Sequence, residues 1–267
     1  MKVTREELKY KQSRPLSEKI EMSQCIIEQW WGYWNSQVYI AFSGGKDSTA
    51  LFHLVRSIFP DIPAVFDDTG LEYPELKEFV RQQQNVIIIR PKLSYRQVIE
   101  KYGYPVISKK VSMGLNRYRV TKSDEQKHLR LWGGINPSSG KKQQPSVSQK
   151  YHYLVNAPFL ISEKCCDVMK KSPFKRYEKL SGRKPYIGTK ASDSNIRTVQ
   201  YLMSGCNAFD NSFNRSLPLS FWFDEDIWEY LRINNLPYAS IYDKGEKQTG
   251  CMFCMFGVQF DNIPTRF

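Results

Sequence analysis

Six consecutive residues, Ser43 to Ser48, have the types and spacing of a phosphate-binding turn. Two glycines inside the turn have no Cβ, so the backbone can curl tightly and point successive N–H groups at an anion. Asp47 and Ser48 favour the first turn of a helix, whose N-terminus attracts negative charge. The sequence therefore predicts a site for nucleotide phosphates, made by Ser43, Gly44, Gly45, Asp47 and Ser48.

The turn differs from a Walker A loop, which has four residues between its first glycine and Gly-Lys-Ser/Thr. The alternative is an ordinary strand-to-helix turn, but the apolar run Tyr39–Phe42 directly before it favours the nucleotide site. Lys46 is positioned to contact a phosphate. Asp47 is better placed to cap the helix or to orient Mg²⁺ than to act as a base.

Four of the six cysteines form two tight pairs, Cys165-Cys166 and Cys251-x-x-Cys254. In a reducing compartment, clustered cysteines favour metal binding or redox chemistry over disulfides. Four thiolates suit a [4Fe–4S] cluster or a structural zinc ion, although adjacent cysteines are an awkward chelate for tetrahedral zinc. Unligated cysteines in the core are the third interpretation.

The composition indicates an ordinary globular protein. The 267 residues are enough for one large α/β domain, or for a domain with an appendage. No run approaches the roughly 18 apolar residues that would cross a bilayer. Residues 1–16 lack the apolar centre of a secretory signal. We therefore expect a soluble cytoplasmic protein with no membrane partner.

Short β-branched runs alternate with helical patterns in the first third of the chain. The runs lie at 38–42, 62–66 and 86–89, and the helical patterns at about 49–58 and 74–84. This alternation predicts parallel βαβ units and a Rossmann-like α/β fold, a twisted parallel sheet with helices on both faces. Ligands bind beyond the carboxyl ends of such strands, where Ser43–Ser48 and Asp67–Gly70 both lie.

Three further segments complete the predicted organisation. The apolar spacing of Ser17–Trp34 suits an amphipathic helix, which predicts an N-terminal helical segment over residues 1–36. A nucleotide-binding domain is expected over 37–267. Inside it we predict a flexible basic insertion at 108–150, where the periodicity disappears, and a cluster- and substrate-binding part at 161–267.

The net charge of +12 favours an anionic partner. Between Lys109 and Lys150, ten basic residues face two acidic ones, so much of the excess lies in the predicted insertion. Aromatic residues in or beside it allow stacking on bases, which favours tRNA or DNA as a partner: Tyr118, Trp132, Tyr151 and Tyr153. A merely solvated loop fits the charge pattern equally well.

Four more segments accompany the turn. They are Asp68-Thr69-Gly70-Leu71-Glu72-Tyr73-Pro74-Glu75, Ile187 to Arg197, Pro218 to Trp228, and Tyr242-Asp243-Lys244-Gly245 followed by Gly250-Cys251. With the turn, they resemble the SGGxDS, DTGxxxPE, IGxRAxESxxR, PLxxWxxxDVW and YDKGxxxxGC elements of the phosphoadenosine phosphosulfate reductase family. This family of PP-loop proteins, with an adenine nucleotide alpha hydrolase-like fold, includes adenylyl-sulfate reductases and DNA-phosphorothioation sulfur-transfer enzymes.

The resemblance implies an adenosine nucleotide as ligand, either ATP or adenosine phosphosulfate, bound also by Asp68, Thr69 and Gly70. The resemblance also implies that Arg197 faces the anionic end of the substrate. From its position at the end of a strand, Asp68 is a candidate for contact with the ribose or with Mg²⁺. The catalytic set implied is Lys46, Asp47, Lys190 and Arg197. The chain departs from the family in having Lys190 for the usual arginine and Asp193 for the usual glutamate, which keeps the charge and changes the reach.

The resemblance also implies the metal group and the reaction. Adenylyl-sulfate reductases hold a [4Fe–4S] cluster with adjacent cysteines and a distant C-x-x-C pair, which implies the same for Cys165, Cys166, Cys251 and Cys254. Family reductases use a cysteine in a C-terminal tail, and this sequence ends at Phe267 without one. We therefore expect ATP-dependent sulfur transfer or adenylation, with a sulfur donor protein as a further partner.

Two alternatives stay open. A sulfonucleotide reductase would use Cys206 or a tail cysteine to attack the sulfur of the bound nucleotide. A non-catalytic nucleotide-binding subunit of a larger assembly is the other alternative. The sequence leaves formation of a homo-oligomer open as well.

Overall fold

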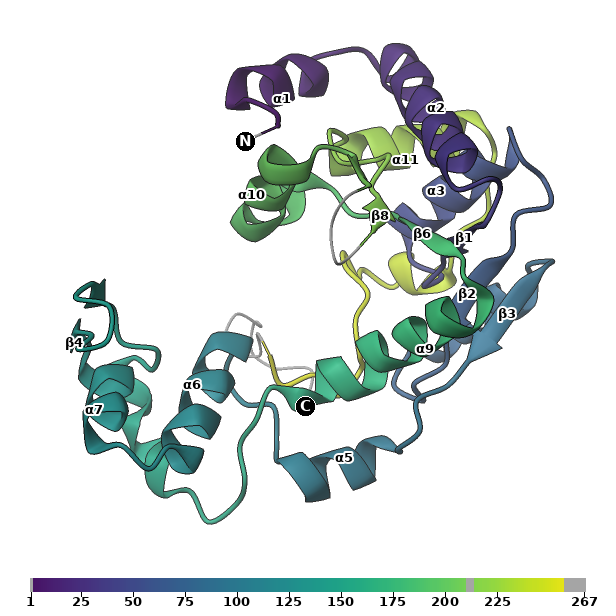
Figure 1. The fold of residues 1–267 in the computed structure, drawn as a ribbon. Coiled ribbons are helices and arrows are strands. Elements are labelled where there is room, and N and C mark those ends of the chain that lie inside the picture. The colour runs from purple at the N-terminus through teal and green to yellow at the C-terminus, as the bar shows by residue number, and fades with distance from the viewer. Residues whose placement is uncertain (1, 210–213, 257–267) are drawn as a thin grey trace. The chain divides into compact units, whose positions relative to one another are not determined.

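The computed structural model describes residues 2–209 and 214–256, in which strands alternate with helices (Figure 1). The strands are β1 Val38–Ala41, β2 Ala64–Asp67, β3 Val86–Ile89, β4 Gly134–Ile135, β5 Lys142–Gln143, β6 Lys184–Ile187, β7 Asn207–Ala208 and β8 Arg215–Ser216. The α-helices are α1 Arg5–Gln12, α2 Leu16–Tyr33, α3 Lys46–Arg56, α4 Pro74–Arg81, α5 Tyr95–Tyr102, α6 Lys109–Val120, α7 Asp124–Trp132, α8 Lys164–Cys166, α9 Ser172–Ser181, α10 Asn195–Ser204 and α11 Asp224–Ile233. Shorter turns of helix are η1 Gln149–Asn156, η2 Asp167–Lys171, η3 Ala191–Asp193 and η4 Ser240–Tyr242.

Contacts divide the chain into two compact units, which we describe separately. The first consists of Met1–Asp68, Glu72–Ile89 and Phe174–Thr249, and the second of Thr69–Leu71, Arg90–Pro173 and Gly250–Phe267. The domain division made from the sequence, at residues 36 and 37, stays a prediction. Its cluster- and substrate-binding part, 161–267, includes residues 257–267, which lie outside the described residues.

The first unit contains a six-stranded sheet with the order β3-β2-β1-β6-β8-β7. β1 runs parallel to both of its neighbours, β2 and β6, and only the short β7 runs antiparallel, against β8. The central place of β1 explains its apolar sequence, because a strand inside a parallel sheet is covered on both faces. The predicted α/β fold with a parallel sheet is confirmed.

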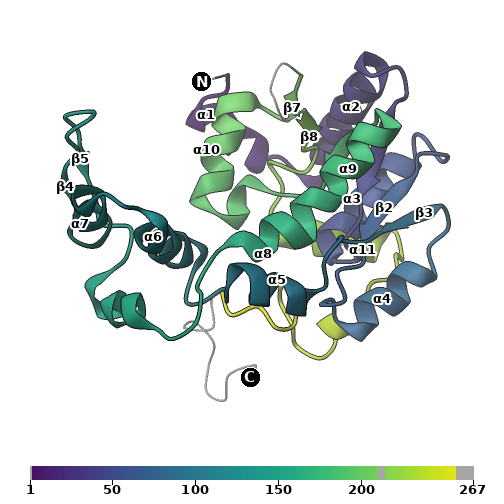
Figure 2. The same cartoon turned by 60° about the horizontal axis from the view of Figure 1, so that its bottom comes forward.

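Alternate residues of β1 point to opposite faces of the sheet, as the period of a strand requires. Ile40 packs in the main core with residues of α2 and α3, whereas Tyr39 contacts α9, where its ring lies 5.0 Å from that of Tyr177. Figure 2 shows α9 and α3 beside the strands of this unit. Helices therefore cover both faces of the sheet, as predicted.

The N-terminal helices belong to the same core. Trp30 of α2 is fully buried, and Trp31 stacks on Phe59 with ring centroids 4.6 Å apart. The buried ammonium of Lys19 lies 2.7 Å from Asp226, whose carboxylate also accepts the N–H of Phe223 at the start of α11. In the described part of the chain, no helix is long and apolar enough to cross a membrane.

The second unit corrects one expectation. Residues 108–150 were predicted to be irregular, but they form α6 and α7. Ser108 and Ser123 each accept a backbone N–H three residues ahead, which is how serine starts a helix. Leu115 and Val147 are fully buried in a small core. The prediction of irregular chain was wrong because frequent polar residues hid these few caps and apolar positions.

Candidate functional site

The turn between β1 and α3 is held by its own serines. The Ser48 hydroxyl donates to the Gly45 carbonyl at 2.8 Å, and the Ser43 N–H donates to Ser48 Oγ at 3.2 Å. Gly44 has φ 76°, and a Cβ there would lie 2.8 Å from a methyl group of Val80. Both its left-handed backbone and this close approach require glycine. The predicted phosphate-binding residues thus form one ordered turn.

The N-terminus of α3 begins in this turn and brings backbone N–H donors to it. Gly45 is the N-cap of α3, and it has no side chain that could accept a hydrogen bond from the first N–H groups of the helix. These N–H groups therefore depend on other partners. The N–H of Lys46 donates to the hydroxyl of Tyr242 at 2.8 Å. A helix terminus of this kind attracts an anion, since the helix dipole adds positive potential to free donors.

A buried lysine lies beside the turn. Lys190 follows β6 and is only 1% exposed. Its ammonium contacts three carboxylates, at 2.6 Å from Asp47, 3.0 Å from Asp224 and 3.1 Å from Asp193. Burial is the largest influence on Lys190 and opposes its charge, but the carboxylates outweigh it and raise the pKa of Lys190 above its ordinary value. Lys190 therefore stays an ammonium.

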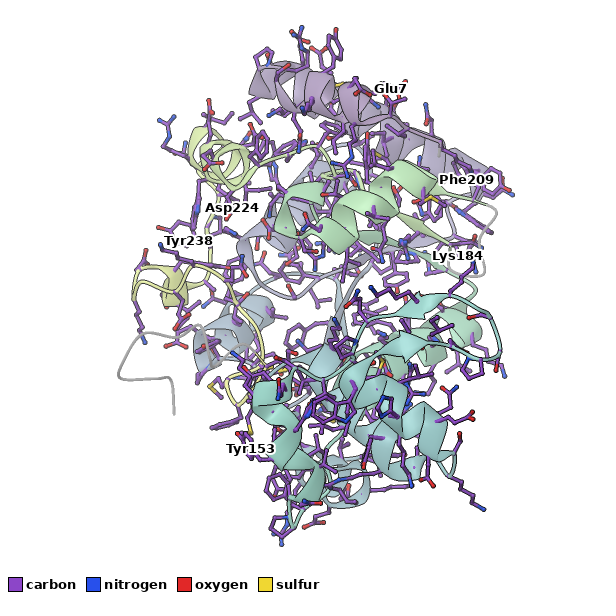
Figure 3. All side chains as sticks on the ribbon, turned by 90° about the vertical axis from the view of Figure 1, so that its left-hand side faces the viewer. Glu7, Tyr153, Lys184, Phe209, Asp224 and Tyr238 are labelled. Carbon is purple, nitrogen blue, oxygen red and sulfur yellow. The ribbon has the colours of Figure 1, made fainter. Side chains whose placement is uncertain are left out.

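Asp224 joins this lysine to a second one. It lies in the first turn of α11 and is labelled in Figure 3. Its other oxygen is 3.3 Å from the ammonium of Lys46, which also lies 3.6 Å from Asp47. Burial opposes the charge of Asp224, yet the two lysines lower its pKa. One carboxylate thus holds two ammonium groups next to the glycine turn.

The fourth residue of the predicted catalytic set is linked to the same network. Arg197, in the first turn of α10, forms an ion pair with Asp193, which also contacts Lys190. Burial opposes the negative charge of Asp193, but its bonds to Lys190 and Arg197 lower its pKa. The Arg197 side chain is 43% exposed and keeps donors available to solvent. The structure brings the four predicted residues together; their roles stay a prediction.

The DTG segment is divided between the two units. Asp68 follows β2 in the first unit and forms an ion pair with Lys77 of α4 at 2.7 Å. Thr69 and Gly70 belong to the second unit, where the Thr69 hydroxyl accepts the N–H of Leu71 at 3.2 Å. The part of these three residues in a nucleotide site stays a prediction.

The paired cysteines all lie in the second unit. Cys165 and Cys166 have sulfur atoms 4.0 Å apart, and with Cys251 they pack in one apolar cluster. Burial is the main cause that raises the pKa of Tyr95 to about 12, and Cys165, Cys254 and Cys251 add to it. Cysteines of both pairs therefore influence the pKa of the same tyrosine, Tyr95.

The chemistry of this donor set fits a thiolate-bound metal group. The hydrogen bond from Cys165 is the main cause that lowers the pKa of Cys166, and Lys109 and Lys170 lower it further against the effect of burial. The hydrogen bond and the cations favour a thiolate at Cys166, the form in which cysteine binds a metal, whereas the same bond and burial raise the pKa of Cys165. Within residues 2–209 and 214–256, no three histidine, cysteine or acidic side chains converge closely enough to hold a metal ion.

Sequence reasoning assigned no role to three residues at the turn: Asp224, Tyr242 and Thr249. Asp224 and Tyr242 lie inside segments that the sequence singled out, but nothing in those segments shows which side chains face Lys46. The Thr249 hydroxyl lies 3.4 Å from the Tyr242 hydroxyl, and no motif in the sequence indicates this contact. Only the arrangement in space identifies these residues.

A parallel sheet with a glycine turn and two lysines at a helix N-terminus defines an α/β protein of the nucleotide-binding type. The family model for the phosphoadenosine phosphosulfate reductase domain matches residues 37–122 and 116–256. The chain belongs to this family.

Curated relatives agree with the family. Adenosine 5'-phosphosulfate reductase of Lysinibacillus sphaericus is 25% identical over 227 residues, covering 84% of this chain and 76% of the relative. The enzyme of the same name from Geobacillus kaustophilus is 26% identical over 231 residues, covering 84% and 76%. An uncharacterized protein of Methanocaldococcus jannaschii is 24% identical over 247 residues. The match covers 89% of this chain but only 47% of that longer protein.

A solved structure supports the fold. The FMN adenylyltransferase of Candida glabrata superimposes with a TM-score of 0.51 and 14% identity, covering 91% of this chain and 67% of that one. At this identity the likeness concerns the fold alone.

Proposed function

We propose that this protein is an ATP-dependent enzyme that adenylates a substrate or transfers sulfur to it. The observation that carries the proposal is the pair of ammonium groups, Lys46 and Lys190, that Asp224 holds beside the Ser43–Ser48 turn. A triphosphate brings several negative charges to one place. Backbone donors, a helix terminus and two lysines together supply the opposite charge there.

In this reaction a substrate oxygen attacks the α-phosphorus of ATP. The bond from that phosphorus to the bridging oxygen breaks, and pyrophosphate leaves with the bonding electrons on the Ser43–Ser48 turn. Sulfur then displaces AMP from the adenylated substrate. The protein contributes mainly positioning and charge stabilisation, by the N–H groups of the turn, Lys46, Lys190 and Arg197. We assign Asp47 to Mg²⁺ and Asp68 to the nucleoside side of the site.

The cysteines of the second unit are the proposed ligands of a [4Fe–4S] cluster: Cys165, Cys166, Cys251 and Cys254. Support comes from three of these cysteines, Cys165, Cys166 and Cys251, which share one apolar cluster. Cys254 acts with Cys165 and Cys251 on the pKa of Tyr95, and nearby cations favour a thiolate at Cys166. When bound, such a cluster supplies electron transfer or an iron site for sulfur. A separate sulfur donor protein fits this scheme.

The second candidate is an adenosine phosphosulfate reductase, and the named relatives favour it. In that reaction the anion on the turn would be part of the phosphosulfate, and a thiol would attack its sulfur. The same turn and lysines serve either nucleotide.

One assay separates the two reactions. The protein is prepared anaerobically and incubated with ATP, sulfide and bulk tRNA or DNA, or with adenosine phosphosulfate and a thiol reductant. We expect pyrophosphate and AMP to form from ATP, with no sulfite from adenosine phosphosulfate. Release of sulfite without pyrophosphate would establish the reductase instead, and binding without turnover of either nucleotide would favour a non-catalytic subunit.

We assign nucleic acid as the macromolecular partner of the segment 108–150. Trp132 at the end of α7 is 56% exposed, and Tyr153 of η1 is 68% exposed. Trp132 contacts His152 with ring centroids 4.7 Å apart, so the end of α7 lies beside η1. Lys141 and Lys142, at the β4–β5 hairpin, are exposed. Exposed rings beside cations suit unpaired bases and their phosphates.

Replacing Lys141 and Lys142 with glutamine is expected to weaken binding to tRNA or single-stranded DNA. Loss of two phosphate contacts should reduce the slope of log K against log salt by roughly 1.4–1.8, because fewer counterions are released. Fluorescence anisotropy over a salt series measures this slope. The control replaces Lys9 and Lys179, two exposed lysines of the first unit. If the control pair had an equal effect, or if the protein bound no nucleic acid at low salt, the assignment would be wrong and segment 108–150 would be a solvated surface without this partner.

A further inference from the structure

The hydroxyl of Tyr242 accepts a hydrogen bond from one of the backbone donors of the phosphate turn. Tyr242 ends η4, and its oxygen accepts the N–H of Lys46 at 2.8 Å. Lys46 is the first residue of α3, so this N–H is one of the helix-terminal donors that anions bind. A neutral side chain therefore sits where the proposed function requires a phosphate oxygen.

A second hydroxyl covers the neighbouring residue. A Cβ built on Gly45 would lie 2.8 Å from Thr249 Oγ1 and 3.2 Å from the Tyr242 hydroxyl. The two hydroxyl oxygens are 3.4 Å apart. Together they occupy the space beside Gly45 that a Cβ would fill.

The segment that carries both hydroxyls is attached next to the turn. Lys244 forms an ion pair with Glu75 in the first turn of α4. The ring of Trp228 in α11 packs edge to face against Tyr242, with centroids 5.4 Å apart, and against Tyr238 at 5.2 Å. The Tyr242 ring is therefore held on one side by an indole, whose fluorescence reports its position.

We propose that Tyr242 and Thr249 close the phosphate turn in the nucleotide-free protein and that a phosphate group must displace them to bind. The proposal rests on the proposed function, because it concerns the same turn. Only a ligand with a negatively charged phosphate is expected to displace the two hydroxyls. A phosphate oxygen accepts a stronger, charge-assisted hydrogen bond than a hydroxyl does, so it replaces Tyr242 on the Lys46 N–H, whereas a ligand without phosphate does not. Tyr242 is thus a gating residue of the site.

The test compares Tyr242→Phe with the wild-type protein. Removing the competing hydroxyl is expected to tighten binding of ATP and of inorganic pyrophosphate by about 2- to 10-fold, the worth of one ordinary hydrogen bond, and to leave binding of adenosine unchanged. Calorimetry measures the affinities. Thr249→Val, which removes the neighbouring hydroxyl, is expected to act in the same direction.

Tyr238→Phe is the matched control. It removes a hydroxyl from the same aromatic group, one that bonds Asp243 at 3.0 Å, and is expected to change no affinity. In the wild-type protein, ATP should alter the part of the tryptophan emission that Trp228→Phe removes, and adenosine should not.

The outcomes separate this proposal from the proposed function. If ATP binds the wild-type protein but Tyr242→Phe weakens binding or leaves it unchanged, the hydroxyl is no competitor and the gating proposal fails alone. If pyrophosphate binds more tightly to the variant while neither protein binds ATP, gating stands and the proposed function fails. If neither protein binds ATP or pyrophosphate, both fail.

Discussion

The variant Gly45→Val is expected to lose nucleotide binding while the protein keeps its fold. Gly45 has φ −76° and ψ 159°, a conformation that valine adopts readily, so the backbone tolerates the change. The valine side chain would fill the space beside the Gly45–Lys46 peptide, where even a Cβ is within 3.2 Å of two side-chain oxygens. The phosphate then loses its approach to the backbone donors.

The size of this effect follows from the bonds that are lost. Each hydrogen bond to a charged group is worth about 1.5–3 kcal/mol, so losing two lowers the affinity for ATP by roughly 100-fold or more. Calorimetry measures the affinity, and circular dichroism checks the fold. Gly32→Val is the control, since a Cβ at Gly32 of α2 meets nothing within 4 Å. Unchanged ATP binding by a folded Gly45→Val protein would place the nucleotide elsewhere.

Anaerobically purified protein is expected to be brown and to contain about four irons per chain. Replacing Cys166 or Cys254 with serine should remove most of this iron, because a hydroxyl is a poor ligand for the iron of such a cluster. Metal analysis and the visible absorption spectrum measure the loss. The prediction follows from the donor set of the second unit, in which Cys165, Cys166 and Cys251 share one apolar cluster.

The control for the cysteine variants is Cys25→Ser, since Cys25 is an exposed cysteine of α2 in the first unit. It should leave the iron content unchanged. Stoichiometric zinc without iron in the anaerobic preparation would contradict the prediction and replace the cluster with a structural zinc site. Full iron content in both Cys166→Ser and Cys254→Ser would show that other residues hold the metal.

The sequence predicted three of the six strands of the sheet, β1, β2 and β3, because each is a short run of apolar and β-branched residues. The runs at 38–42, 62–66 and 86–89 became strands at 38–41, 64–67 and 86–89. β1 and β2 lie inside the sheet, and a strand covered on both faces is apolar, so it is visible without knowledge of its partners. β3 lies at the edge, with Ile87 and Ile88 40% and 51% exposed, and its β-branched residues alone indicated a strand. The turn after the first strand was equally visible, since Gly44 needs both a left-handed backbone and a close approach to Val80.

The other contacts of the site depend on residues that are far apart in the sequence. Asp224 and Lys46 come together only because α11 packs against α3, and Tyr242 reaches the turn from η4. Local patterns carry no trace of such contacts. The helices α6 and α7 were missed for another reason: each buries few residues, and the charged residues within them resemble those of a solvated loop.

The position of β1 inside the sheet also governs the order in which the protein can fold during synthesis. One neighbour, β2, follows it closely, but the other is β6, and Arg183 beside that strand is 145 residues beyond its partner Val38. At a synthesis rate of about 5–20 residues per second, the open edge of β1 waits on the order of ten seconds for its partner. An apolar strand with an unpaired edge is prone to aggregate, so the nascent chain is expected to depend on chaperones until residues 184–187 leave the ribosome.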